Sequence, residues 1–236
     1  MTRNQGRGAI VTGGSRGIGL ATVQALLRAG YEVVSLSRSP PPTAERLSHW
    51  SCDIEDLESV ERAAEGLVER AARWERTVLV HNASLHRHDA TDQLSAQQLL
   101  AVLSANLAAP QALNLRLTPV MQPGSSVLYI GSTLAEKAVA GACSYVVSKH
   151  GMAGLMRATC QDLAGRGIHT VCLCPGFTDT AMLRAHLGDA VDAVTGMVAA
   201  KRLLLPSEIA DLVLVCAENP ALNGAMLHAN LGQIER

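Results

Sequence analysis

Gly8-Ala-Ile-Val-Thr12 is a short apolar run, and Gly13-Gly-Ser-Arg-Gly17-Ile-Gly19 follows it at once. The next ten residues, Leu20-Ala-Thr-Val-Gln-Ala-Leu-Leu-Arg-Ala29, have helical periodicity and stop at Gly30. This order predicts a buried strand, a glycine turn and a helix. Glycines in such a turn let a diphosphate approach the backbone, and the amides and dipole at the start of the helix favour its charge. The stretch therefore predicts an α/β fold with a diphosphate site at the turn.

Length and composition favour one domain over residues 1–236. The chain is 48% hydrophobic, with a mean hydropathy of +0.16, which is enough for one well-buried α/β core and short for two. A formal net charge of -1 gives no reason to expect nucleic acid or an anionic membrane as partner. The first residues lack the apolar run of a signal peptide, and no uninterrupted apolar stretch approaches a membrane span. We expect a cytoplasmic protein with a small-molecule partner.

Further strands and helices alternate along the chain. We expect strands at 31–37, 49–53, 77–81, 127–130, 168–174 and 225–229, helices at 57–72, 94–120 and 206–215, and a helix that carries Tyr145 and Lys149 and runs to about Ala164. Ser39-Pro-Pro-Pro42 forbids a long helix after the second strand, so the crossover over 43–48 should be a short helix. The Met- and Ala-rich segment 181–205 fits either a lid over a ligand or a plain surface helix.

The end of the second strand indicates the type of cofactor. An NAD site would place an acid there to bind the adenosine ribose, but the strand ends in Ser37-Arg38. Arg16, inside the glycine turn, is a second cation that could reach a 2'-phosphate, so the pair favours NADP(H). Asp53 ends the third strand, where it either contacts the adenine or caps a helix from Glu55 onward.

Tyr145-Val-Val-Ser-Lys149 carries the candidate chemistry. Positions four apart share one face of a helix, and an ammonium beside a phenol stabilises the phenolate, which makes tyrosine an able general acid or base. Ser132 follows the strand at 127–130 and could hydrogen-bond a substrate carbonyl. Asn106 lies amid apolar residues in the helix at 94–120, where its amide should bond a backbone carbonyl or hold a water.

No metal site is expected. The six cysteines lie in apolar segments, and Cys172 and Cys174 should face the same side of a strand without a third ligand nearby. His86 and His88, next to an acid on a loop, are better read as solvated or as lining a substrate entrance. The side chains that could enclose a substrate are those of His86, Cys143, Met182, His186 and Met197.

Taken together, these motifs resemble the short-chain dehydrogenase/reductase family from about Gly8 to Gly232. The resemblance implies a single Rossmann fold with a parallel sheet of seven strands in the order 3-2-1-4-5-6-7, helices on both faces, and hydride transfer between NADP(H) and a carbonyl or alcohol. It also implies a likeness to 3-oxoacyl reductases. The catalytic residues would be Asn106, Ser132, Tyr145 and Lys149.

The roles are those that the family gives to these positions. Tyr145 would donate a proton to the ketone oxygen, Ser132 would polarise the carbonyl, Lys149 would assist Tyr145 and hold the ribose, and Asn106 would keep a water in a relay to Lys149. The cofactor-binding residues would be Gly13, Ser15, Arg16, Gly17, Ile18, Gly19, Arg38, Asp53, Ile54, Asn82, Ala83, Ser84, Tyr145, Lys149, Pro175, Gly176, Thr178 and Thr180.

The sequence departs from the family at three places. His81-Asn-Ala-Ser84 replaces Asn-Asn-Ala-Gly and is similar to pterin-reducing members. Asn230-Leu-Gly232 replaces Asp-Gly-Gly, and Met121-Gln-Pro-Gly124 replaces the basic residues of carrier-protein reductases. The alternatives that stay open are a catalytically silent NADP(H)-binding protein and a reductase of pterin, C=N or C=C bonds. The resemblance further implies a homodimer or homotetramer built on the helices that contain Asn106 and Tyr145.

Overall fold

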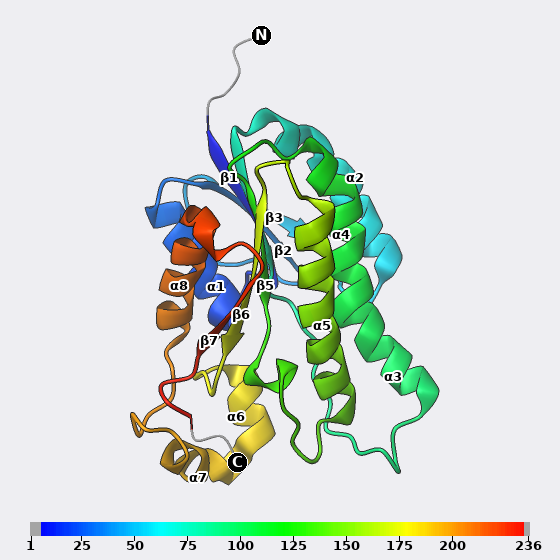
Figure 1. The fold of residues 1–236 in the computed structure, drawn as a ribbon, viewed down its shortest axis with the longest axis vertical. Coiled ribbons are helices and arrows are strands. Elements are labelled where there is room, and N and C mark those ends of the chain that lie inside the picture. Colours follow the sequence, from blue (N-terminus) through cyan, green and yellow to red (C-terminus); the bar gives the residue numbers. More distant parts are fainter. Residues whose placement is uncertain (1–5, 234–236) are drawn as a thin grey trace.

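The computed structural model describes residues 6–233, apart from the side chains of residues 186 and 189. Within these residues, seven parallel strands form one sheet in the order β3-β2-β1-β4-β5-β6-β7 (Figure 1). They are β1 (Arg7–Thr12), β2 (Glu32–Ser37), β3 (Leu47–Ser51), β4 (Arg76–His81), β5 (Ser126–Ile130), β6 (His169–Pro175) and β7 (Ala225–Ala229). The predicted Rossmann-type sheet and its strand order are confirmed.

Helices cover both faces of this sheet (Figure 1). On one face, α1 (Gly17–Arg28) packs against α8 (Pro206–Glu218); on the other lie α2 (Leu57–Arg73), α4 (Ala109–Leu117) and α5 (Cys143–Asp162). The helix α3 (Ala96–Leu103) leads into α4, and α6 (Ala181–Leu187) and α7 (Val191–Gly196) lie beyond the carboxyl ends of the strands. This edge of the sheet is where open α/β folds bind ligands.

The crossover between β2 and β3 differs from expectation, because residues 38–46 contain no helix. Pro40, Pro41 and Pro42 have no amide N–H to donate, and Arg46 has a φ of 62°, which no helical residue adopts. The third strand is also shifted: β3 covers Leu47–Ser51 rather than 49–53, in register with Val33–Ser37 of β2.

The start of α2 shows which aspartate caps it. Asp56 accepts a hydrogen bond from the Glu58 N–H over 3.0 Å, so α2 begins at Leu57 and not at Glu55. Asp53 instead accepts from the Glu55 N–H over 3.0 Å and closes the turn before the helix. The capping role that the sequence allowed for Asp53 is therefore taken by Asp56.

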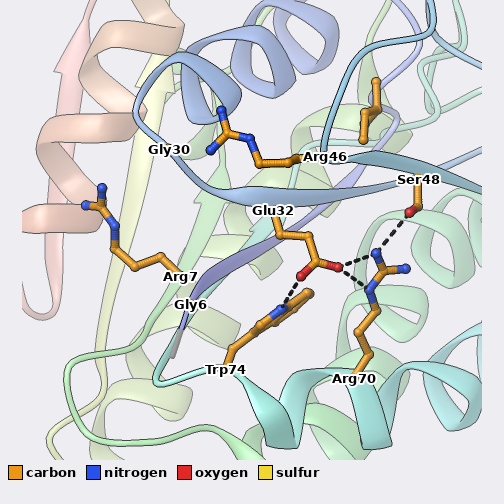
Figure 2. A pocket seen from close by; sticks show the side chains of 9 residues that line it. Gly6, Arg7, Gly30, Glu32, Arg46, Ser48, Arg70 and Trp74 are labelled. Atoms are coloured by element: carbon orange, nitrogen blue, oxygen red, sulfur yellow. Dashed lines mark hydrogen bonds and ion pairs between the residues drawn. The ribbon is translucent and has the colours of Figure 1, made fainter. Parts of the chain in front are cut away.

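A hollow of about 450 Å³ lies at the amino ends of β1, β2 and β3 (Figure 2). In its wall, Arg70 Nε and Trp74 Nε1 donate to Glu32 over 2.8 and 3.0 Å. Burial would raise the pKa of Glu32, but the hydrogen bonds from Trp74 and Arg70, with the charge of Arg70, outweigh it and lower the pKa. These bonds tie β2 to α2, so the ion pair supports the fold at the edge opposite to the glycine turn.

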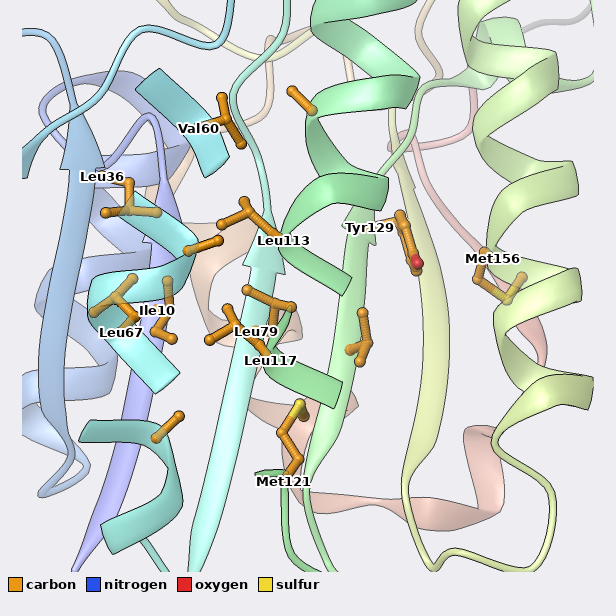
Figure 3. Packing of buried hydrophobic residues seen from close by; sticks show 14 of the residues in the cluster. Ile10, Leu36, Val60, Leu67, Leu79, Leu113, Leu117, Met121, Tyr129 and Met156 are labelled. Atoms are coloured by element: carbon orange, nitrogen blue, oxygen red, sulfur yellow. The ribbon is translucent and has the colours of Figure 1, made fainter. Parts of the chain in front are cut away.

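The core consists of two apolar layers, one on each face of the sheet. Figure 3 shows the layer under α2 and α4, where Leu67, Leu113 and Leu117 pack against Ile10 and Leu79. The other layer joins alternate strand residues to α1 and α8. Since both faces are covered, β1 and β4 are buried over every residue but their first, and each large apolar side chain they bury contributes about 1.5–3 kcal/mol.

Two kinds of feature are absent from the described residues. None of their helices combines the length and the apolar character that crossing a bilayer requires. No group of three or more His, Cys, Asp or Glu side chains among them is arranged to hold a metal ion.

Candidate active site

The glycine turn between β1 and α1 is held closed by backbone contacts. Gly13 has a φ of 68°, and its N–H donates to the Leu36 carbonyl over 2.7 Å, which ties the turn to the end of β2. A Cβ on Gly19 would lie 2.1 Å from the Gly13 carbonyl oxygen, so only glycine fits there. Arg16 precedes the first residue of α1, and the first amides of that helix lie at the carboxyl edge of the sheet.

Asn82 and Ala83 connect the end of β4 to the same turn. Both of their N–H groups donate to Thr12 Oγ1, over 2.9 and 3.0 Å, and Asn82 Nδ2 donates to the Thr12 carbonyl over 2.9 Å. These bonds hold the ends of β1 and β4 at a fixed separation. The two residues predicted to contact the cofactor thus also shape the turn that would receive it.

Two polar side chains near the turn fit a dinucleotide. Ser84 Oγ is buried, and none of the described residues hydrogen-bonds it, so a polar ligand at this edge would satisfy it. Thr180 caps α6 by accepting from the Leu183 N–H over 3.2 Å, and its methyl group lies 3.3 Å from where a Cβ on Gly17 would stand. The segment after β6 therefore folds back over the start of α1, as a site for a bound diphosphate requires.

Arg38 lies in a corner with a second arginine and one acid. Its guanidinium is 3.6 Å from Glu55, and the guanidinium of Arg87 is 3.7 Å from the other oxygen of the same carboxylate. Glu55 is two residues beyond Asp53, the predicted adenine contact. A 2'-phosphate entering this corner would compete with Glu55 for two exposed cations. Sequence reasoning found Arg38 but missed Glu55 and Arg87, because their meeting depends on tertiary structure.

Lys149 is buried at the end of β5, with an exposed fraction of 1%. Its ammonium donates to the Ile130 carbonyl over 2.8 Å and lies 5.3 Å from the centre of the Tyr145 ring. Ser132 follows Ile130 by two residues, and its Oγ accepts from the Leu134 N–H over 3.1 Å. The fold thus brings the ammonium beside the phenol ring and the strand end that delivers the serine.

Asn106 lies in a π-helical turn, Ser104–Ala108, between α3 and α4. Its Oδ1 accepts from the Leu85 N–H over 2.7 Å, and its Nδ2 donates to the Leu85 carbonyl and to Ser148 Oγ, both over 2.9 Å. Of the two arrangements expected from the sequence, the bond to a backbone carbonyl is the one observed. The wide turn aims this amide at the segment after β4 and at α5, next to Lys149.

The candidate substrate residues come from the loop after β4, from the start of α5 and from α6. The His86 ring contacts the Tyr145 ring edge-on, with 4.6 Å between the ring centres, and Cys143 Sγ lies 3.6 Å from Thr91 Oγ1 at the start of α5. Met182 is 47% exposed on α6. The side chain of His186, also on α6, lies outside the part of the chain that the structure describes.

The segment after β6 packs against the last residue of β7 and the residue that follows it. The Gly176 N–H donates to the Ala229 carbonyl over 2.8 Å, and Thr178 Oγ1 donates to the Gly176 carbonyl over 3.1 Å. A Cβ on Gly176 would meet Asn230 at 2.8 Å. The Asn-Leu-Gly ending that departs from the family pattern therefore closes against Pro175-Gly176, with Leu231 in the left-handed region at a φ of 53°.

Asp89 was missed as a site residue. The sequence presented it as an acid beside two loop histidines, whereas its carboxylate accepts bonds from the Ser144 N–H, over 2.9 Å, and from the Ser144 hydroxyl. The available signal was weak: neither Ala142, the residue before α5, nor Cys143, its first residue, can cap a helix with a side-chain oxygen. A helix start that lacks its own cap needs one from elsewhere in the chain.

The comparisons with known proteins agree with this geometry. A family model described as short chain dehydrogenase matches residues 7–189. The chain is 31% identical over 230 residues to carbonyl reductase family member 4 from Danio rerio, covering 93% of this chain and 94% of that protein. It is 29% identical over 230 residues to the 3-oxoacyl-[acyl-carrier-protein] reductase MabA from Mycobacterium tuberculosis, covering 96% and 92%. A short chain dehydrogenase from Burkholderia cenocepacia, solved in complex with NADP, superimposes with a TM-score of 0.85 at 28% identity, covering 98% and 99%.

Proposed function

Because the chain belongs to the short-chain dehydrogenase family, we propose that it is an NADP(H)-dependent oxidoreductase that reduces a small ketone to an alcohol. One observation carries this proposal. The Tyr145 ring and the buried ammonium of Lys149 lie 5.3 Å apart at the edge of the sheet where the glycine turn also opens. A proton donor and a dinucleotide turn at one edge are what carbonyl reduction requires.

Three polar residues carry out or assist proton donation to the substrate, and a fourth anchors the helix that carries two of them. Tyr145 donates its proton to the ketone oxygen as that oxygen gains charge, and Lys149 stabilises the phenolate that is left. Ser132 Oγ accepts from a backbone N–H, which leaves its own proton to donate to the same substrate oxygen. Asn106 anchors α5 through Ser148, one residue before Lys149. A bound nicotinamide supplies the hydride that the carbonyl carbon receives.

The arginines at the end of β2 and in the glycine turn support NADP(H) as the cofactor. Arg38 stands where an NAD site would carry an acid, and its exposed guanidinium makes a 3.6 Å contact with Glu55 that a 2'-phosphate could replace. The neighbouring structure from Burkholderia cenocepacia was solved with NADP. Arg16 is the second cation that supports 2'-phosphate binding, because it lies in the glycine turn directly before the first helical residue of α1.

The relatives and one apolar hollow support proposals on the substrate class and on the assembly. The names of two relatives, a carbonyl reductase and a 3-oxoacyl carrier-protein reductase, support a ketone or a 3-oxoacyl thioester as substrate. The hollow on the outer side of α3, the π turn and α5 is lined by Leu100, Leu103, Leu107 and Leu155. A second copy of the chain would cover it, which supports a homo-oligomer.

The free state of all six cysteines supports a reducing, cytoplasmic location.

The test is oxidation of NADPH and of NADH by the purified protein, with a panel of small ketones and short 3-oxoacyl thioesters. We expect turnover with at least one ketone and a kcat/KM for NADPH at least about tenfold above that for NADH, which corresponds to about 1.4 kcal/mol. Tight NADPH binding without turnover on any substrate would instead establish a silent binding protein. Turnover confined to pterins, imines or enones would establish the other reaction on the same scaffold.

A further inference from the structure

The first turn of α5, which carries Tyr145, is capped by a residue from a distant loop. Ala142, the residue that precedes the helix, supplies no side-chain bond. Asp89, from the loop after β4, accepts from the Cys143 N–H with its carbonyl over 3.3 Å and from the Ser144 N–H with its carboxylate over 2.9 Å. The same carboxylate accepts from the Ser144 hydroxyl. One aspartate therefore satisfies the first two amides of the helix.

The loop that contains Asp89 also donates a hydrogen bond to the loop before α5, and the two loops are closely packed. The Asp89 N–H donates to the Gly141 carbonyl over 3.1 Å, and Asp89 forms a parallel bridge with Ala142. Gly141 has a φ of 78°, and a Cβ on it would lie 2.5 Å from the His88 ring. The two loops thus meet in a short ladder that fixes where α5 begins.

Tyr145 is the residue directly after Ser144, so its place depends on this cap. The rest of α5 is held by burial of side chains farther along, among them Lys149, Met152 and Met156. Loss of the cap would therefore release mainly the first turn. A misplacement of a reacting group by about 1 Å can cost about a hundredfold in rate. The same loop also supplies His86, whose ring contacts the Tyr145 ring.

From these contacts we propose that Asp89 is a positioning residue: it caps α5 from outside the helix and so holds the Tyr145 phenol in place for proton donation. The inference rests on the proposed reductase activity. Asp56 provides a control, because its carboxylate also accepts from the second N–H of a helix, that of Glu58 in α2, over 3.0 Å, although Asp56 directly precedes its helix. That helix carries none of the four candidate catalytic residues.

The kinetic test compares Asp89→Ala and Asp89→Asn with Asp56→Ala and Asp56→Asn, at a temperature well below the unfolding of each variant. We expect Asp89→Ala to lower kcat at least about tenfold. Asp89→Asn should lose less, because its amide oxygen can still accept the Ser144 N–H. The solvent deuterium isotope effect on kcat should grow in the Asp89 variants, since proton donation then limits the rate. The Asp56 variants should change the unfolding temperature only.

A second measurement does not need turnover. The chain has three tyrosines, so ring resonances of ¹³C-tyrosine protein can be assigned with one Tyr145→Phe variant. The Tyr145 resonance should move in Asp89→Asn and Asp89→Ala and stay in place in the Asp56 pair. An unmoved Tyr145 resonance in folded Asp89 variants, or equal losses of kcat in both pairs, would overturn the proposal. Absence of any ketone turnover in the unaltered protein would overturn the reductase function alone and leave the resonance test standing.

Discussion

At the scale of one residue, Lys149 is a buried charge that lowers the stability of the fold and is explained by its chemical role. It is the one lysine among the described residues that is buried, and the bonds of its ammonium are to the Ile130 carbonyl and, at 3.8 Å, to the Met152 sulfur. Burying a charge without a counter-charge is unfavourable, and an apolar side chain of the same length would pack there at lower cost. The ammonium is therefore best explained by its place 5.3 Å from the Tyr145 ring.

The first prediction separates the contribution of Lys149 to catalysis from its contribution to stability. Lys149→Met should lower kcat about a hundredfold, because the phenolate loses its cation. The free energy of unfolding should stay equal or rise by about 1 kcal/mol or more, since the buried charge is gone. Steady-state kinetics and urea unfolding of the same preparation check both. A loss of stability of more than about 3 kcal/mol would mean that the ammonium is structural.

The second prediction concerns the corner around Arg38. Arg38→Glu should reverse the cofactor preference, lowering kcat/KM for NADPH by about tenfold to a hundredfold, because a carboxylate repels the 2'-phosphate and can bond the ribose of NADH. Arg28→Glu is the control, since Arg28 is exposed in the last turn of α1, at the other end of that helix. If Arg38→Glu leaves the ratio of the two kcat/KM values unchanged, the 2'-phosphate is not bound there.

At the scale of an element, the segment from α3 to α4 shows which features of a helix its sequence pattern can predict and which it cannot. Apolar periodicity predicts one helix over 94–120, and the structure has helical turns from Ala96 to Val120. The π turn at Ser104–Ala108 could not be predicted, because it is stabilised by contacts of Asn106 with Leu85 and Ser148, which are remote in sequence. The same holds for the cap of α5, whose acceptor is 55 residues away.

The strand β4 ends in a buried histidine that belongs to a polar network. His81 Nε2 lies 2.8 Å from Asn114 Oδ1, and Asn114 Nδ2 donates to the Tyr129 hydroxyl over 2.8 Å. The Tyr129 hydroxyl lies 2.9 Å from Thr159 Oγ1. These bonds join β4, α4, β5 and α5, and burial lowers the pKa of His81 to about 4.

The third prediction follows from this pKa. The unfolded chain binds a proton at His81 near pH 6.5, and the folded chain does so only near pH 4. His81 therefore contributes stability above pH 6.5 that is lost as the pH falls to 4, up to about 3 kcal/mol. In His81→Asn the loss of stability that is due to His81 should disappear, while the losses due to other titrating groups should remain. Urea unfolding at pH 7 and pH 4.5 tests it, and equal pH dependence in both proteins would contradict the assignment.

At the scale of the whole molecule, the carboxyl edge of the sheet gathers residues that are far apart in sequence. The alternation of strands and helices predicts a parallel sheet, and the motifs after β1, β4 and β5 then converge on one edge without further information. Register and crossovers were less predictable. Residues 38–46 form no helix, and the corner where Glu55 meets Arg38 and Arg87 depends on how two loops approach each other.

The fourth prediction concerns assembly. Leu100 is 65% exposed in the apolar hollow beside α5, so a second copy of the chain would bury it. Leu100→Glu should place a charge in that interface and shift the protein to a smaller species in sedimentation equilibrium. Leu57→Glu, at the exposed start of α2 and outside the hollow, should leave the assembly intact. If Leu100→Glu sediments like the unaltered protein, the hollow is not the interface.

The most direct test of the central claim is kcat for NADPH-dependent ketone reduction by Tyr145→Phe, compared with the unaltered protein. The phenylalanine keeps the ring that contacts His86 and lies beside Lys149 but removes the proton donor. We predict that kcat falls by about 10²–10⁴-fold while the variant folds and still binds NADPH. A kcat within a few-fold of the unaltered protein would contradict the assignment of Tyr145 as the general acid.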